Sequence, residues 1–332
     1  AHSSTPQAFP VDRESAAAEA SIVLVGMRCS GKSHLARTAA SVLGWRCIDL
    51  DDELVRAAEA TCAEVIATRG WDGFRALELE VLQAALIAFP FRAVISCGGG
   101  IVETEAARAC LATYISAAHG GARVVRLHRA LIDVDAELNG PSEAGGEGSA
   151  ERPKYSGNVS VRDVFERRQP WFVAVSTHDF VMHPGETDWD QVNCEFGVFC
   201  RRITKGALRN ASALPKAPRF VLSVSGAGPD PSAAMSAAGL AGVDAVEIRV
   251  DECDSCSPIA VLRTLAAFRR AVDTAHFDLP IIFTARSSRQ GGAFAGAAPG
   301  DGDDAVAFEE RLFAFARLAL RSGCEFVDVE CC

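Results

Sequence analysis

The stretch Ser21–Ser33, SIVLVGMRCSGKS, ends in a loop that matches the pattern GxxxxGK[ST] at every fixed position. In such a loop, Gly26 and Gly31 let backbone N–H groups turn inward around a polyphosphate, and Lys32 brings a positive charge to the phosphates. The hydroxyl of Ser33 can ligate magnesium. A chance loop is the alternative, but four fixed positions between an apolar run and a helical pattern favour phosphate binding. The expected binding residues are Gly26, Met27, Arg28, Cys29, Ser30, Gly31, Lys32 and Ser33.

Two carboxylates follow the next apolar run, in Ile48-Asp49-Leu50-Asp51-Asp52. If this run is a strand, Asp49 and Asp51 lie at the carboxyl edge of a parallel sheet, where ligands bind, and strand alternation puts both on one face. Paired carboxylates beside a phosphate loop can hold magnesium and can orient or deprotonate an attacking hydroxyl. A helix N-terminus that prefers Asp is the alternative, and this motif alone leaves both interpretations open.

Arginines and glycines supply two further candidate sites. Arg75 precedes Glu78 by one helical turn, so it could grip a substrate carboxylate while Glu78 holds its guanidinium; taken alone, this spacing favours a surface ion pair. The run Gly98–Gly100 predicts a backbone that passes close to a ligand, because three successive glycines cost conformational entropy. Arg152, before Pro153, and Arg168, before Gln169-Pro170, could bind phosphoryl or carboxylate groups, although such arginines more often lie on solvated faces.

The hydrophobic pattern divides the chain into two regions that alternate between strands and helices. Residues 21–204 predict a doubly wound α/β domain, with a helix at 32–43 and strands at 22–25, 46–50, 93–97, 124–127 and 180–182. Residues 139–157 are rich in Gly, Ser and charge and predict a mobile loop. Residues 219–332 predict half of a (β/α)8 barrel, with strands at 220–224, 245–250, 281–285 and 326–329 and helices near 231–241, 257–275 and 304–322. Residues 1–20 predict a disordered lead, and residues 205–218 a linker.

Composition limits the classes of function. The chain has 332 residues, 49% of them apolar, and a net charge of −10, so it can bury two cores and has no general nucleic-acid surface. Its apolar stretches are too short to span a membrane, and its N-terminus lacks the features of a signal peptide. Twelve scattered cysteines are typical of reduced thiols in a cytoplasmic protein. The single CxxC, Cys253 and Cys256, has no second pair at metal-ligand spacing.

In order and approximate spacing, these motifs resemble shikimate kinase along the whole first region. The wording GMRxxGKS, CGGGIVET, ERRxPW and DWDQV is similar to the shikimate kinase region of the fungal pentafunctional arom polypeptide. The resemblance implies that Gly26–Ser33 bind ATP and that Ser33 and Asp49 hold Mg²⁺. It implies catalytic roles for Lys32, Asp51 and the lid residue Arg152. It also implies shikimate binding by Asp51, Arg75, Gly98, Gly99, Gly100 and Arg168.

The second region resembles type I 3-dehydroquinate dehydratase in the segments GVDAVEIRVD, LPIIFTARSSRQGG and GCEFVDVE. Glu247, Arg249 and Arg286 match substrate-binding positions of that family. The resemblance implies a Schiff-base lysine and a catalytic histidine on later strands, which this chain does not contain. We therefore expect a vestigial site without dehydratase activity. We also expect the half barrel to be less stable than the first domain. Lys205 and Lys216 both precede the first strand of this region.

Two classes of function remain open at this stage. One is a shikimate kinase that belongs to an arom-type polypeptide, with shikimate as substrate and further arom domains or a second copy as partners. The other is a regulator, because fungal quinate-pathway repressors resemble the same domains and would use the pocket to sense a metabolite. The complete set of kinase residues favours the enzyme.

Overall fold

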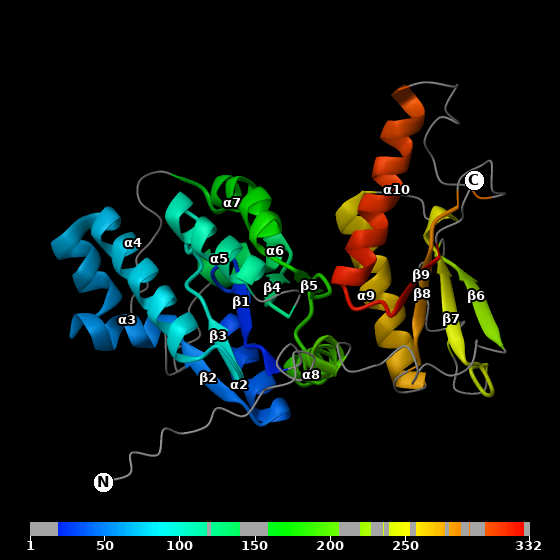
Figure 1. The fold of residues 1–332 in the computed structure, drawn as a ribbon, viewed down its shortest axis with the longest axis horizontal. Coiled ribbons are helices and arrows are strands. Elements are labelled where there is room, and N and C mark those ends of the chain that lie inside the picture. Colours follow the sequence, from blue (N-terminus) through cyan, green and yellow to red (C-terminus); the bar gives the residue numbers. More distant parts are fainter. Residues whose placement is uncertain are drawn as a thin grey trace, which may run out of the picture.

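The computed structural model describes residues 19–117, 121–139, 159–205, 220–226, 235, 239–252, 257–275, 279–286, 292 and 303–328. Within these residues, the strands of the N-terminal half form one parallel sheet and those of the C-terminal half form another (Figure 1). Both parallel sheets were predicted. No helix in the described ranges is both long and apolar enough to cross a membrane.

The first sheet has the strand order β2-β3-β1-β4-β5, and all its described pairings are parallel. Its strands are β1 (Ile22–Gly26), β2 (Arg46–Asp49), β3 (Ala93–Ser96), β4 (Arg123–His128) and β5 (His178–Val181). Its helices are α2 (Lys32–Leu43), α3 (Leu50–Ala58), α4 (Cys62–Ala88), α5 (Glu105–Ala117), α6 (Leu131–Asn139), α7 (Val161–Val175) and α8 (Trp189–Lys205). The predicted strands and the predicted helix at 32–43 are present, with strand ends shifted by one or two residues.

The central strand β1 has apolar side chains on both faces, which explains its unbroken apolar sequence. Ile22 and Leu24 belong to the core beneath α2 and α8. Val23 and Val25 belong to the opposite core, beneath α3, α4, α5 and α7. The sheet is therefore covered on both sides, as the predicted doubly wound class requires.

The second sheet has the order β6-β7-β8-β9 and is also parallel. Its elements are β6 (Val221–Ser225), β7 (Ala245–Arg249), the short 3-10 helix η3 (Val250–Glu252), α9 (Pro258–Ala275), β8 (Ile281–Thr284), α10 (Asp303–Arg321) and β9 (Phe326–Asp328). Its core joins strand residues such as Ile248 and Phe283 to Leu265 on α9 and Phe315 on α10. This arrangement is consistent with part of a barrel.

Some expectations differ from the structure, and others lie outside its described residues. Glu19 accepts a backbone hydrogen bond from Arg92 and Ala20 is buried, so the predicted lead at 1–20 overlaps the fold by two residues. In the helix predicted at 231–241, residues 239–241 form turns instead. The linker predicted at 205–218 begins one residue too early, because Lys205 is the last residue of α8. The rest of that linker, the predicted mobile loop beyond Asn139, Cys253 and Cys256 lie outside the described residues.

Candidate active site

The phosphate loop connects β1 to α2, so the N-terminus of α2 points toward the loop (Figure 1). At Gly31 φ is +81°, a left-handed conformation, and an added Cβ would lie 2.8 Å from Cη2 of Trp189. At Gly26 an added Cβ would lie 2.7 Å from the carbonyl oxygen of Leu127. The two glycines of the motif are thus required by backbone conformation and by close packing.

Lys32 lies in the first turn of α2 and is 8% exposed. Its Nζ donates a 2.7 Å hydrogen bond to the carbonyl oxygen of Met27, which places the ammonium inside the loop. Burial lowers the pKa of Lys32 from 10.5 to about 8, and the carboxylates of Asp51 and Asp49 oppose this shift. The side chain therefore remains a cation at neutral pH. Because it has already lost most of its hydration, it favours binding of an anion.

Asp49 and Asp51 lie at the junction of β2 and α3. Asp49 ends β2 and caps α3, since its Oδ1 accepts a 3.0 Å hydrogen bond from the backbone N–H of Asp51. The expectation that strand alternation places both on one face is wrong, because Asp51 already lies in the first helical turn. The capping alternative is correct for Asp49. Both carboxylates nevertheless lie near enough to Lys32 to act on its charge.

The glycine run after β3 lies against side chains from the neighbouring elements. A Cβ at Gly98 would be 2.5 Å from Oε1 of Glu78 and 3.0 Å from Oδ1 of Asp51. A Cβ at Gly99 would be 2.8 Å from the backbone nitrogen of Arg28 in the phosphate loop. Each glycine is therefore a point where the backbone must approach another part of the site.

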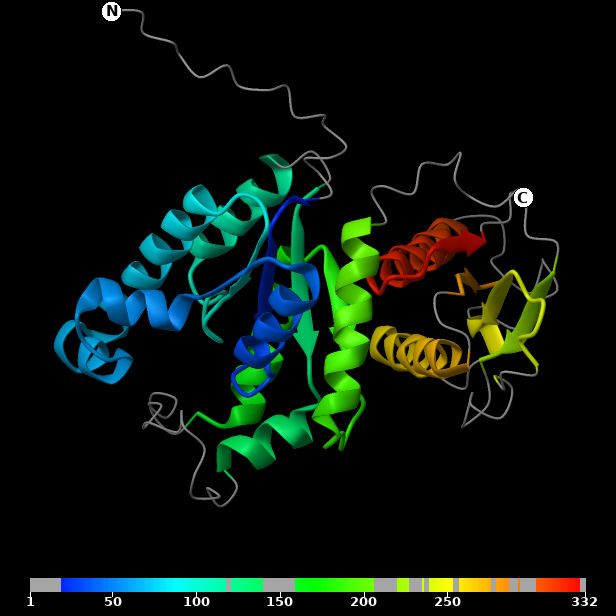
Figure 2. The ribbon, with the colours of Figure 1, turned by 90° about the horizontal axis from the view of Figure 1, so that it is seen from below.

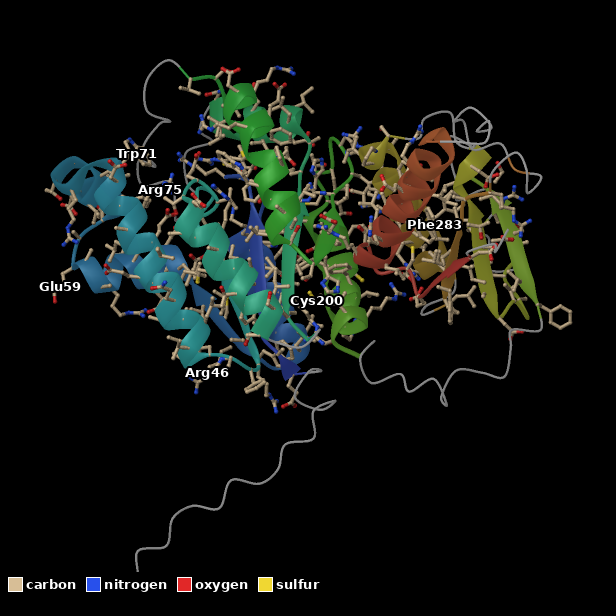
Figure 3. The ribbon with its side chains drawn as sticks, turned by 45° about the horizontal axis from the view of Figure 1, so that its top comes forward. Arg46, Glu59, Trp71, Arg75, Cys200 and Phe283 are labelled. Carbon is tan, nitrogen blue, oxygen red and sulfur yellow. The ribbon has the colours of Figure 1, made fainter. Side chains whose placement is uncertain are left out.

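Gly100 faces the guanidinium of Arg75, which an added Cβ would overlap. Arg75 lies on α4 beside Trp71, with its Cζ 5.3 Å from the ring centroid (Figure 3). It pairs with Glu78, and the two side chains are 15% and 7% exposed. The favoured interpretation as a surface ion pair is therefore wrong. Burial raises the pKa of Glu78, and the charge of Arg75 opposes that shift.

Arg168, on α7, is a second cation directed at the glycine run. Its Nη1 donates a 2.8 Å hydrogen bond to the carbonyl oxygen of Gly99, and its Nε donates a 2.7 Å bond to Oε1 of Glu103. The side chain is 3% exposed. The alternative of a solvated face is thus wrong for Arg168, although the neighbouring Arg167 is 46% exposed. Arg152 lies outside the described residues.

For several residues near the site, the sequence analysis predicted no role. Arg129, which follows β4, donates a 2.6 Å hydrogen bond to the carbonyl oxygen of Cys29 in the phosphate loop. Its Cζ lies 5.6 Å from the ring centroid of Trp189, which itself packs on Gly31. Cys97 is buried, and burial raises the pKa of its thiol while Lys32 lowers it. The contact of Arg129 with the loop spans 100 positions, so only the fold reveals it.

The residues that the motifs suggest for magnesium supply oxygen donors of the kind that this ion prefers. Ser33 follows Lys32 in α2, and Asp49 lies at the adjacent edge of β2. In the described part of the chain, no group of three or more His, Cys, Asp or Glu residues could hold a metal ion. One hydroxyl and one carboxylate therefore fit an ion whose remaining ligands are water and phosphate oxygens.

We call the part of the chain that forms the first sheet and its helices the first unit, and the part that forms the second sheet and its helices the second unit. The site predicted in the second unit is brought together in part. Nη2 of Arg286 lies 3.9 Å from Oε1 of Glu247 and 3.4 Å from Oδ2 of Asp328. Arg249 instead forms an ion pair with Asp251, with 2.7 Å between Nη2 and Oδ2. Glu247, in the middle of β7, and Arg286, which follows β8, are thus neighbours, whereas Arg249 pairs with a carboxylate two residues further along the chain.

A phosphate loop after the central strand of a parallel sheet, with a buried lysine and with two arginines against the neighbouring glycine run, defines the first unit as a P-loop α/β domain of the kinase type. Residues 28–178 match the shikimate kinase family, and residues 224–332 match the type I 3-dehydroquinase family. The chain thus carries a shikimate kinase domain followed by part of a type I dehydroquinase domain, and it is homologous to the fungal pentafunctional AROM polypeptide.

Two curated relatives illustrate this similarity. The pentafunctional AROM polypeptide of Schizosaccharomyces japonicus is 33% identical over 320 residues, which are 94% of this chain and 19% of that protein. The corresponding protein of Clavispora lusitaniae is 33% identical over 312 residues, or 93% of this chain and 18% of that protein. The chain therefore spans about a fifth of the length of these relatives.

Among solved structures, the chain is similar to the shikimate kinase from Acinetobacter baumannii in complex with shikimate. That match has a TM-score of 0.45 and 21% sequence identity, and it covers 60% of this chain and 99% of that chain.

Proposed function

We propose that this protein is a shikimate kinase, which transfers the γ-phosphoryl group of ATP to the 3-hydroxyl of shikimate in aromatic amino-acid biosynthesis. The observation that carries the proposal is that the glycine run Gly98–Gly100 lies against both the proposed phosphate-donor side and the proposed acceptor side of the site. Gly99 lies against the phosphate loop at Arg28, whereas Gly100 lies against the guanidinium of Arg75. A phosphate donor and a small anionic acceptor bound there would be neighbours.

The acceptor side of the site suits a hydroxylated carboxylic acid. Arg75 and Arg168 would bind the carboxylate of shikimate. Arg168 is buried, Arg75 is largely buried, and each is held by a glutamate that fixes its guanidinium. The glycine run would let the ring of the acceptor approach the backbone closely. Asp51 is exposed at the same edge and would accept a hydrogen bond from an acceptor hydroxyl.

The transfer forms a bond between the 3-oxygen of shikimate and the γ-phosphorus and breaks the bond from that phosphorus to the β,γ-bridging oxygen. Asp51 would orient the hydroxyl and take its proton, while Lys32 would neutralise charge on the phosphates. Arg152, if carried by a lid, would add a second positive charge. Magnesium held by Ser33 and Asp49 would supply further charge neutralisation.

Shikimate-dependent ADP release tests this proposal and separates it from the alternative of a metabolite sensor. We expect ADP release with ATP, Mg²⁺ and shikimate, and none above background with quinate or 3-dehydroquinate, because the proposed acceptor is shikimate. Calorimetry with shikimate provides the comparison. Shikimate binding without ADP release would identify a sensor rather than a kinase.

We also propose that residues 219–332 by themselves can bind a dehydroquinate-like ligand but have no dehydratase activity. The chain has no lysine after Lys216, so none of the described strands β6 to β9 supplies the amine that would form an imine with dehydroquinate. Incubation with dehydroquinate and borohydride, followed by mass spectrometry, should yield no stoichiometric adduct. A reduced adduct on any lysine of the chain would contradict this.

We also propose residues 21–204 and 219–332 as the extents of the two domains.

A further inference from the structure

The second unit is attached to the first by charged side chains along β5 and α8, where α9 and α10 pack (Figure 2). Arg202 on α8 forms a two-pronged ion pair with Asp273 on α9, with distances of 2.9 and 2.6 Å. Arg270 on α9 lies 2.7 Å from Oε2 of Glu186, which precedes α8. These contacts fix α9 beside the edge of the first sheet.

A cavity of about 1160 Å³ lies at the carboxyl ends of β4 and β5. Its lining includes Arg28 of the phosphate loop, Leu131 at the start of α6, and Pro184, which follows β5. It also includes Arg263, which lies on α9 and so comes from the second unit. The cavity therefore begins at the phosphate loop and extends to the interface between the two units.

The strand order decides which part of a bound nucleotide would extend into this cavity. The phosphate loop follows β1, and the residues proposed to hold the acceptor lie on the side of β2 and β3. With phosphates in the loop and the acceptor on that side, the ribose and base must extend over the other half of the edge, along β4 and β5. That half contains the cavity.

Arg263 is free to meet such a ligand. Its side chain is exposed, and among the described residues it has no hydrogen bond or ion pair. Its positive charge nevertheless reaches the first unit, since it contributes to lowering the pKa of His128, the last residue of β4, although burial of the imidazole is the larger cause. A guanidinium in this position can stack on a base and donate hydrogen bonds to it.

We infer that Arg263 of the dehydroquinase-like unit is a nucleotide-binding residue of the kinase, and that its guanidinium contacts the base and ribose of the bound nucleotide. The second unit thereby completes the kinase site. This inference rests on the proposed function for the identity of the nucleotide, but it concerns binding rather than transfer.

The test compares full-length Arg263→Ala with the parental protein by calorimetry, using Mg·ADP and, separately, inorganic tripolyphosphate. We expect the Kd for ADP to rise about fivefold or more, with the Kd for tripolyphosphate unchanged, because only ADP has a base and ribose. Arg263→Lys should recover little of the loss, since an ammonium cannot stack as a guanidinium does. Arg317→Ala, an exposed arginine of α10, is the matched control and should bind both ligands normally.

Two outcomes would overturn the inference. Unchanged binding of ADP to Arg263→Ala would show that the residue does not contact the nucleotide. Equal weakening of ADP and tripolyphosphate would show a general electrostatic effect instead of a contact with the nucleoside. Failure of the proposed function is distinguishable, because it would abolish shikimate-dependent ADP release while leaving these binding measurements intact.

Discussion

Lys32 illustrates how one residue of the site depends on its environment. Its burial lowers the pKa of the ammonium to about 8, and the carboxylate of Asp51 limits that shift. Because the loop carbonyl of Met27 holds the ammonium, the charge is in place before any ligand arrives. Because this cation is already held in position, little free energy is spent on reorganising the loop when phosphate binds.

Nucleotide affinity should therefore fall as pH rises above about 8. Below this pKa, Lys32 is charged and attracts the phosphates. Above it, Lys32 of the free protein is neutral and must take up a proton when the nucleotide binds. The Kd for ADP should therefore rise by up to about tenfold per pH unit. Phosphate is already fully ionised at this pH. Calorimetry from pH 7 to 9.5 measures the effect, and Lys32→Ala should bind weakly with no such dependence. A parental Kd that is flat to pH 9.5 would contradict the assignment.

At the residue scale, the sequence predicted most of the candidate site, because GxxxxGKS, the Arg75–Glu78 spacing and the glycine run are local patterns. It could not predict that Arg168 is buried and Arg75 largely buried, since burial depends on packing between distant elements. Glu103 lies in the segment CGGGIVET, but no role was predicted for it, because its contact with Arg168, 65 positions away, depends on the same packing.

Element boundaries explain the error at Asp49 and Asp51. The apolar run predicted β2 correctly, but a period of two was extended through Leu50 into a helix. Asp49 is a good N-cap, and its bond to the N–H of Asp51 starts α3 at once. Strand and helix signals overlap over these residues: Asp49 keeps the extended backbone of β2, whereas Asp51 follows helical geometry.

The glycine run is an element that can be tested by adding a single methyl group. In Gly100→Ala, the new Cβ would overlap the guanidinium of Arg75, whose flexible end must then move. We expect the KM for shikimate to rise about tenfold or more, with the KM for ATP nearly unchanged, because the phosphate loop is not displaced.

A double-mutant cycle provides the control for this prediction. If Gly100→Ala acts by displacing Arg75, adding it to Arg75→Ala should produce little further increase in the KM for shikimate. Fully additive effects would show that the methyl group acts on something other than Arg75. An unchanged KM in both single variants would remove Arg75 from the acceptor site.

At the scale of the whole molecule, the two units share a buried carboxylate. Asp179 on β5 accepts hydrogen bonds from Arg126 of β4 at 2.6 Å and from Arg321 of α10 at 2.9 Å. Arg321 also donates a 2.7 Å hydrogen bond to Ser176. The second unit thus covers the edge strand of the first sheet, which would otherwise present unpaired backbone groups. Hydrophobic periodicity predicted both sheets but contained no information about this interface.

Arg321→Ala should destabilise the first unit although it lies outside that unit. The change leaves the buried Asp179 with Arg126 as its remaining partner among the described residues and removes a donor from Ser176, so we expect the free energy of unfolding to fall by about 1–3 kcal/mol. Urea unfolding followed by fluorescence measures it. Arg317→Ala, an exposed arginine on the same helix, should change stability by less than about 0.5 kcal/mol. Equal stability of both variants would show that the interface contributes nothing to the fold.

The most direct test of the proposed activity is the rate of shikimate-dependent ADP release in Lys32→Ala and Asp51→Asn. Both residues would act on charge that develops during transfer, so kcat should fall about 100-fold or more in each, about 2.7 kcal/mol at 1.36 kcal/mol per tenfold. Asp52→Asn, the exposed neighbour of Asp51, should keep a nearly parental rate. Near-parental ADP release by either Lys32→Ala or Asp51→Asn would contradict the proposed mechanism.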